Sequence, residues 1–194
     1  ANRTSAMASN ASKPFQAQHI VRAGFDSPST LITNDPAELQ AFVRQCGRVI
    51  YKSISSVRSI VREVGNDVSE QALERLRYLP TQFQEFIDGT NVRVHVVGAE
   101  VFATEIQSDA VDYRYAGREE KTVMMSATAL PEQIVERCRT LSAMLDLPLC
   151  GIDLKRDNAG RYYCFEVNPS PAYSYYQENA GQPIAEALVR FLAG

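Results

Sequence analysis

The chain has 194 residues, of which 45% are hydrophobic and 22% are charged. These values exclude a disordered, collagen-like or low-complexity chain, and the length is sufficient to bury a hydrophobic core. The formal net charge of −3 argues against long-range attraction to a nucleic acid or an anionic membrane, so neither is expected as a partner.

No apolar run approaches the roughly 18 residues that a membrane span requires. The first residues contain no apolar segment of a signal peptide, and the absence of an initial Met predicts a fragment. The four cysteines lie far apart without a C-x-x-C pair, and the two histidines are too few to favour a zinc site. We therefore expect a cytoplasmic protein whose four cysteines are reduced and packed in its core, in preference to a disulfide framework.

The first 30 residues form a polar stretch rich in Ser, Asn and Ala, which predicts a loop or an arm. A helix is predicted to begin at Pro36, because Asp35 is a good N-cap and Glu38 stands in the first turn. This helix should end at Gly47, which tolerates a left-handed conformation. The pattern continues with two strands and a helix, at residues 48–52, 57–64 and 69–77. This order describes a small α+β lobe.

The second half is richer in strands. Valines at 92, 94 and 96 alternate with Arg93 and His95, which predicts a strand with one buried face and one face toward a cleft or water. On that strand His95 is expected to be half-buried with its hydrogen bonds satisfied. The other predicted elements are a hairpin turn at 98–99, strands at 100–107, 121–128, 149–155 and 161–167, helices from Pro131 and over 184–192, a long loop at 108–120, and either a packed aromatic loop or an acceptor pocket at Tyr173, Tyr175 and Tyr176.

Three polar residues of the predicted hairpin form the main candidate site. Asp153 and Glu166 lie on adjacent antiparallel strands and can project from one face, and Asn168 follows two residues later on the same side. Hard oxygen ligands from paired strands suit Mg²⁺, which keeps several waters and completes its shell with substrate phosphates. The alternative, given equal weight, is that an alternating strand simply places polar residues on its solvent face.

Two further motifs are weak when taken alone. Lys52 ends a strand whose other residues are expected to be buried, so its ammonium group needs a partner such as a phosphate, or it reaches the solvent at the strand end. Residues 83–89 form an extended segment between the two halves. Its backbone could pair with a purine edge, or it could be an ordinary strand followed by a turn.

In chain order these motifs resemble those of the ATP-grasp enzymes. The similarity is to the RimK-like (ribosomal-protein glutamate-ligase-like) group and to the ligases that cyclise graspetide (microviridin-type) peptides, and it extends from about residue 10 to the C-terminus. It implies an α+β ATP-grasp fold of two lobes whose antiparallel sheets clasp a nucleotide, with the upstream domain of the family missing. The implied segments are an arm at 1–27, a small lid lobe at 28–83 and a large lobe with the metal site at 84–194.

The resemblance also implies roles for individual residues. ATP would be bound by Lys13, Lys52, Gln84, Glu85, Phe86, Ile87 and Asn91, the metal by Asp153, Glu166 and Asn168, and the catalytic residues would be Arg93, Arg114 and Lys155. The lysines at 13 and 52 would hold the triphosphate, backbone groups of residues 85 and 87 the purine, and Arg114 a substrate carboxylate or the acyl-phosphate. Glu166 would bridge two Mg²⁺ ions, with Mn²⁺ as an alternative metal.

The chain departs from the family pattern at two places. Asn91 stands where the family usually has an acid for the ribose hydroxyls, and residues 53–56 lack the glycines that many members place over the phosphates.

The function that the resemblance implies is ATP-dependent ligation of a carboxylate to an amine through an acyl-phosphate. The substrate would be an amino acid, a peptide or a protein, and a homo-oligomer is left open. One alternative is a catalytically degenerate ATP-binding module that acts as a regulatory or partner subunit. A second is an α+β interaction domain that binds no nucleotide.

Overall fold

The computed structural model describes residues 1–52, 62–64, 70–108 and 122–194. These residues separate into two compact units. The larger unit contains Ala1–Ser27, Asp88–Ser108 and Thr122–Gly194, and the smaller unit contains the described part of Pro28–Ile87.

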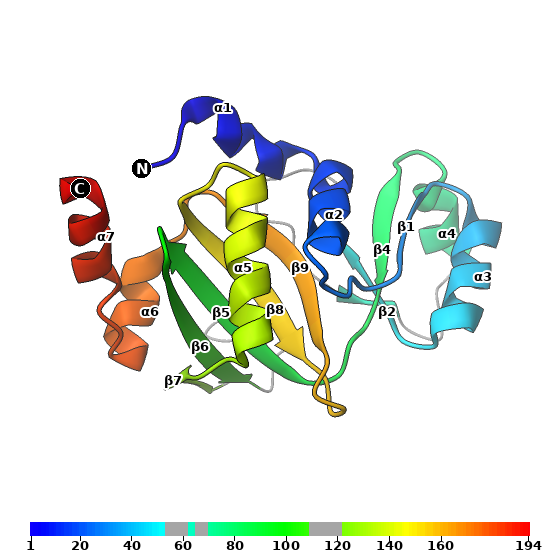
Figure 1. Ribbon diagram of the computed structural model, residues 1–194. Helices are drawn as coiled ribbons and strands as arrows, with labels where there is room; N and C mark the ends of the chain where they lie inside the picture. The colour runs from blue at the N-terminus through cyan, green and yellow to red at the C-terminus, as the bar shows by residue number, and fades with distance from the viewer. Residues whose placement is uncertain (53–61, 65–69, 109–121) are drawn as a thin grey trace. The chain divides into compact units, whose positions relative to one another are not determined.

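The larger unit is built on a five-stranded antiparallel sheet with the strand order β7-β6-β5-β8-β9 (Figure 1). The strands are β5 (Thr90–Val97), β6 (Glu100–Ser108), β7 (Val123–Thr128), β8 (Leu149–Arg156) and β9 (Tyr162–Asn168). The helices are α1 (Thr4–Met7), the 3₁₀-helix η1 (Ala8–Ala11), α2 (Lys13–Arg22), α5 (Glu132–Met144), α6 (Tyr173–Ala180) and α7 (Ile184–Ala193).

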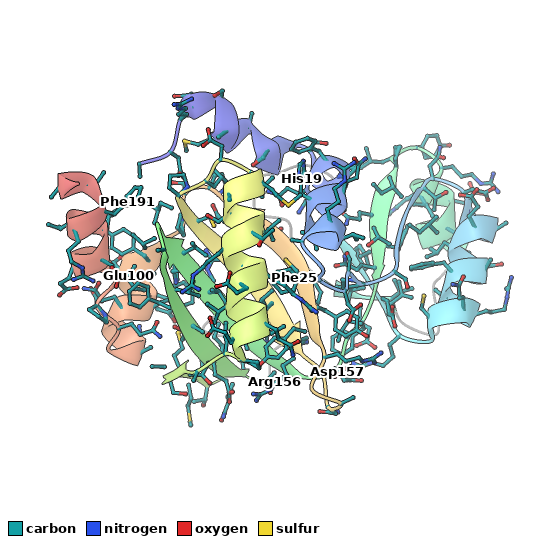
Figure 2. All side chains as sticks on the ribbon, in the orientation of Figure 1. His19, Phe25, Glu100, Arg156, Asp157 and Phe191 are labelled. Atoms are coloured by element: carbon teal, nitrogen blue, oxygen red, sulfur yellow. The ribbon has the colours of Figure 1, made fainter. Side chains whose placement is uncertain are left out.

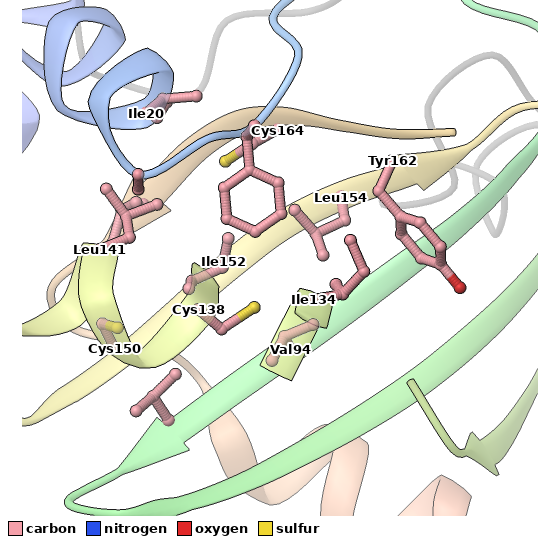
Figure 3. Close-up of a cluster of buried hydrophobic side chains, with 14 of the residues drawn as sticks. Ile20, Val94, Ile134, Cys138, Leu141, Cys150, Ile152, Leu154, Tyr162 and Cys164 are labelled. Carbon is pink, nitrogen blue, oxygen red and sulfur yellow. The ribbon is translucent and has the colours of Figure 1, made fainter. Parts of the chain in front are cut away.

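Alternation along the strands divides the sheet of the larger unit into two faces. Val92, Val94 and Val96 of β5 are at most 2% exposed and lie on one face with Ile152 of β8. Helix α5 lies across this face, and its buried Cys138 belongs to the same core (Figure 3). The predicted valine alternation is therefore confirmed, and the core leaves the opposite face for polar residues.

The loop predicted for the first 30 residues was wrong, because residues 4–22 are mostly helical. Ser12 caps α2 by accepting from the N–H of Phe15, and Ile20 of α2 lies in the core of the larger unit. Buried Gln16 donates from Nε2 to the Val167 carbonyl at 2.7 Å and accepts from the Val167 N–H at 3.0 Å. This polar segment therefore forms a helix, and the side-chain amide of Gln16 binds the backbone of β9. The division into segments 1–27, 28–83 and 84–194 stays a prediction.

The smaller unit contains a four-stranded antiparallel sheet with the order β1-β4-β2-β3. Its elements are β1 (Thr30–Thr33), α3 (Pro36–Cys46), β2 (Val49–Lys52), β3 (Arg62–Glu63), α4 (Glu70–Leu76) and β4 (Thr81–Glu85). The predicted helix is confirmed, since Asp35 accepts from the N–H of Ala37 and α3 ends at Gly47 with φ 75°. Of the strand predicted at 57–64, residues 57–61 lie outside the described part, and β3 occupies Arg62–Glu63.

The remaining expectations for the second half meet mixed outcomes. The predicted strands of the larger sheet are confirmed, and so are the two helices predicted in this half, α5 and α7. Helix α6 occupies the stretch expected to be an aromatic loop. The long loop at 108–120 falls almost entirely outside the described residues. All four cysteines are free, and three of them are buried, with Cys46 only partly so. Among the described helices, none has the length and apolarity of a membrane span.

Candidate functional site

A row of charged residues crosses three strands on the polar face of the larger sheet. Arg93 of β5 is paired in register with Asp153 of β8, which is paired in turn with Glu166 of β9. Paired residues of antiparallel strands project from the same face, so the three side chains are neighbours. Arg93 donates from Nη1 to Asp153 Oδ1 at 2.6 Å. The predicted juxtaposition of the two carboxylates is confirmed by this register.

A β-bulge places Glu166 on the polar face. Asp153 pairs with Glu166 but Leu154 pairs with Cys164, so Phe165 is an extra residue in β9. Both Cys164 and Val167 are fully buried in the core, three positions apart, which strict alternation cannot achieve. Without the bulge, the carboxylate would point into the core with Cys164.

Each carboxylate of the row has a cationic partner. Lys13, at the start of α2, donates from Nζ to Glu166 Oε2 at 3.1 Å, and both side chains are about one-fifth to one-quarter exposed. Asp153 has Arg93, whose side chain is 6% exposed. The row therefore contains two adjacent ion pairs, one in which both side chains are partly exposed and one in which only the arginine is nearly buried.

The oxygen donors of this face fit Mg²⁺. Asn168 pairs with Gly151, two positions along each strand from the Asp153–Glu166 pair, and its Oδ1 accepts from the Ser170 N–H at 2.9 Å. No group of three or more His, Cys, Asp and Glu able to hold a metal occurs in the part of the chain that is described. Two carboxylates and one amide are a partial shell, which suits an ion that keeps waters and binds substrate phosphates.

Two residues that sequence reasoning did not assign to the site surround Arg93. A Cβ atom built on Gly151 would lie 2.1 Å from Arg93 Nη2, so the guanidinium occupies the space that a side chain would need. The ring of Tyr176 on α6 lies over the guanidinium, with its centroid 5.4 Å from Cζ. Gly151 stands two residues before Asp153 and was visible in the sequence, but only the contact with Arg93 on the neighbouring strand explains why a glycine is needed there.

His95 is more deeply buried than the sequence predicted. It is 0% exposed, and neither ring nitrogen has a hydrogen-bond partner among the residues described. Burial, and secondarily the charge of Arg93, lowers the pKa of His95 from 6.5 to about 3. The expectation of a half-buried, satisfied histidine was wrong, because α6 covers this end of the face and brings Tyr176 to 5.0 Å from the imidazole.

This buried imidazole predicts a pH-dependent stability. The unfolded chain binds a proton at His95 below about pH 6.5, whereas the folded chain does so only near pH 3, so stability falls as the pH decreases through this window. We expect unfolding in urea to require roughly 1 kcal/mol less free energy at pH 5.5 than at pH 7.5 on account of His95 alone.

The matched comparison uses both histidines of the chain. His95→Leu should lose this pH difference, whereas His19→Leu, at a partly exposed position on α2 (Figure 2), should keep the contribution of His95. An equal pH difference in wild type and His95→Leu would show that the imidazole does not titrate as its burial implies.

Of the other predicted site residues in the larger unit, Asn91 and Lys155 lie on neighbouring strands. Lys155 is 9% exposed and pairs in register with Asn91 and with Tyr163, on the strands beside it. Arg114 lies outside the described residues. The predicted roles of these residues therefore stay predictions.

In the smaller unit, Lys52 is buried and does not reach solvent at the strand end. It is 8% exposed and donates from Nζ to Gln84 Oε1 at 3.3 Å, and Gln84 Nε2 donates to Thr30 Oγ1 at 3.1 Å. The alternative of a solvent-reaching lysine was wrong, because β2 is flanked by β3 and β4. The side chain of Gln84 thus links Lys52 to Thr30.

The segment 85–87 uses part of its backbone within the smaller unit. The N–H of Glu85 donates to the Ser29 carbonyl, and the N–H of Phe86 donates to the Arg48 carbonyl, each at 2.9 Å. The guanidinium of Arg48 lies 3.8 Å from the centroid of the Phe86 ring. Recognition of a purine edge by this segment would therefore rest on its carbonyl groups and on the N–H of Ile87. Residues 53–56, which lack the glycines of many family members, lie outside the described part.

Comparisons with known proteins agree with this geometry. A family model described as the RimK-like ATP-grasp domain matches residues 10–192. A curated relative, the probable alpha-L-glutamate ligase of Syntrophotalea carbinolica (strain DSM 2380 / NBRC 103641 / GraBd1), is 25% identical over 202 residues, which cover 98% of this chain and 66% of the relative.

Solved structures of peptide ligases are also similar. The ATP-grasp ligase PsnB, complexed with a phosphomimetic variant of its minimal precursor, Mg and ADP, has a TM-score of 0.84 at 28% identity. The Chryseobacterium gregarium RiPP-associated ATP-grasp ligase, in complex with ADP and a leader and core peptide, has a TM-score of 0.85 at 26% identity. Each match covers 98% of this chain but only 61% and 62% of the respective ligase.

Proposed function

Because the chain belongs to the RimK-like ATP-grasp family, we propose that it binds ATP with Mg²⁺ and ligates a carboxylate to an amine through an acyl-phosphate. The observation that supports this most directly is the row of Arg93, Asp153 and Glu166 on paired strands, with Lys13 on the outer carboxylate. This row combines metal-binding oxygens with cations, as phosphoryl transfer requires.

In this proposal Asp153, Glu166 and Asn168 would hold the metal, either two Mg²⁺ ions or Mn²⁺. When bound, the metal would neutralise charge on the phosphates. Lys13 and Arg93 lie next to these ligands and would add positive charge for a group whose negative charge is spread over its oxygens. Lys52 and Gln84 are the proposed nucleotide-binding side chains of the smaller unit.

No side chain is required to attack the substrate covalently in this mechanism. The cysteines of the larger unit also do not suit that role, because burial raises the pKa of Cys138 and of Cys150 to about 12. The γ-phosphoryl group would pass to the carboxylate, and the amine would then displace phosphate. Catalysis would depend on positioning and on charge neutralisation.

We propose an amino acid, a peptide or a protein side chain as the carboxylate substrate, with Arg114 as a carboxylate-binding residue. The support is the glutamate ligase and the precursor-bound peptide ligases among the similar proteins. Four free cysteines support a reducing compartment such as the cytoplasm. A homo-oligomer stays a prediction.

The test is trapping of the acyl-phosphate. The protein is incubated with ATP, Mg²⁺ and hydroxylamine, with either glutamate or a peptide rich in acidic side chains as the carboxylate. We expect ADP release that depends on the carboxylate, together with the corresponding hydroxamate. Nucleotide binding without carboxylate-dependent ADP release would instead support the ATP-binding module without ligase activity. Failure of a folded protein to bind any nucleotide would contradict the proposal.

A further inference from the structure

The guanidinium of Arg93 is enclosed by three different groups. The carboxylate of Asp153 accepts its Nη1 hydrogen bond at 2.6 Å, the ring of Tyr176 lies 5.4 Å from its Cζ, and the backbone of Gly151 lies beneath it. Arg93 is 5% exposed as a whole residue, although its side chain carries a full charge. This enclosure fixes both the position and the plane of the group.

The backbone below the guanidinium depends on a missing side chain. A Cβ on Gly151 would approach Nη2, Cζ and Nε of Arg93 to 2.1, 2.5 and 2.8 Å, and real Cβ atoms do not approach other atoms so closely. Gly151 pairs with His95, two positions along each strand from the Arg93–Asp153 pair, so the arginine side chain crosses diagonally over it. Any other residue at 151 would displace the guanidinium.

The aromatic group above the guanidinium is itself held in place. Tyr176 on α6 is 7% exposed, and its ring lies 5.0 Å from that of His95 and 5.4 Å from that of Tyr175. His95 carries no charge at neutral pH, whereas the charged guanidinium of Arg93 lies over the Tyr176 ring. The face of an aromatic ring attracts a cation, more strongly where water is excluded.

We propose that Tyr176 and Gly151 are positioning residues for Arg93, and that they hold its guanidinium in the orientation in which it binds the nucleotide phosphates. This inference rests on the proposed function, which assigns phosphate binding to Arg93. Neither residue touches the nucleotide in this scheme. Tyr176 acts through its ring and Gly151 through the absence of a side chain.

The experiment measures the dissociation constant of Mg·ADP by calorimetry in wild type and in single variants. Tyr176→Leu should weaken binding about 3- to 30-fold, the range that corresponds to a cation–π contact. Tyr176→Phe, which keeps the ring, should bind within about twofold of wild type. Phe191→Leu serves as the matched loss of an aromatic ring, on α7 (Figure 2), and should leave binding unchanged.

A double-mutant cycle separates positioning from general damage to the fold. In the Arg93→Met background, Tyr176→Leu and Gly151→Ala should each change the dissociation constant by less than about twofold, because no guanidinium remains to be oriented. An equal loss in both backgrounds would overturn the proposal, as would wild-type binding by Tyr176→Leu. Loss of binding in Tyr176→Phe to the level of Tyr176→Leu would also overturn it.

A second readout needs no nucleotide and so separates this inference from the proposed function. The Nε–H of Arg93 should give an NMR signal shifted by the Tyr176 ring and slow to exchange with water. This signal should move toward the position of a free arginine in Tyr176→Leu but not in Tyr176→Phe. An unshifted signal in wild type would overturn the positioning role, whereas a shifted signal with no Mg·ADP binding would contradict only the proposed function.

Discussion

Replacement of Glu166 by Gln is expected to abolish Mg²⁺-dependent nucleotide binding and turnover while leaving the fold intact. Glu166 is a quarter exposed at the end of a row of paired residues, and its known partner is the ammonium group of Lys13. The amide keeps the shape of the side chain but removes the negative charge that a divalent cation requires. The lost pair with Lys13 is partly exposed, so its removal should cost little stability.

The measurement is the thermal shift with ADP, with and without Mg²⁺. Ligand at about 100 times its dissociation constant adds about 2.7 kcal/mol, which raises the melting temperature of a chain of this size by roughly 5–10 °C. This Mg²⁺-dependent rise should occur in wild type and in Glu178→Gln, a matched change at an exposed position on α6, and not in Glu166→Gln. Wild-type turnover by Glu166→Gln would contradict the metal assignment.

The elements with local signals were predicted from sequence. The Asp35–Pro36 start and the Gly47 end define α3 because capping depends on neighbouring residues. The alternating valines of β5 likewise identified its buried face. The pairing of β8 with β9 followed from a hairpin with a short turn, whereas the Asp153–Glu166 register itself depends on the bulge.

The features that were missed depend on contacts between distant residues. Helix α2 contains a polar side chain, Gln16, whose burial makes sense only with the Val167 backbone beside it. The bulge at Phe165 follows from the need to bury Cys164 and Val167 on one face and to present Glu166 on the other. Burial of His95 follows from the packing of Tyr176, and alternation alone cannot show that a polar face is covered.

Truncation of Asp153 and truncation of Arg93, which form an ion pair, are expected to lower the free energy of unfolding by different amounts. Asp153→Ala would leave the Arg93 charge in a position where 6% of its side chain is exposed, whereas Arg93→Met would leave an Asp153 side chain that is 27% exposed. A charge that loses a carboxylate or guanidinium partner costs more where water cannot reach it. We expect Asp153→Ala to lower the free energy of unfolding by about 3 kcal/mol, which is about 6–12 °C in melting temperature, and Arg93→Met by clearly less.

The double variant makes this prediction sharper. Asp153→Ala combined with Arg93→Met removes both charges, so the double variant should be more stable than Asp153→Ala alone. Denaturant unfolding without nucleotide measures this, and Glu100→Ala provides the control, because Glu100 (Figure 2) pairs with Arg190 at 2.8 Å while both side chains remain about half exposed. That exposed pair should contribute less than about 1 kcal/mol. If the double variant were instead the least stable, the burial of Arg93 would not be the cause of the loss.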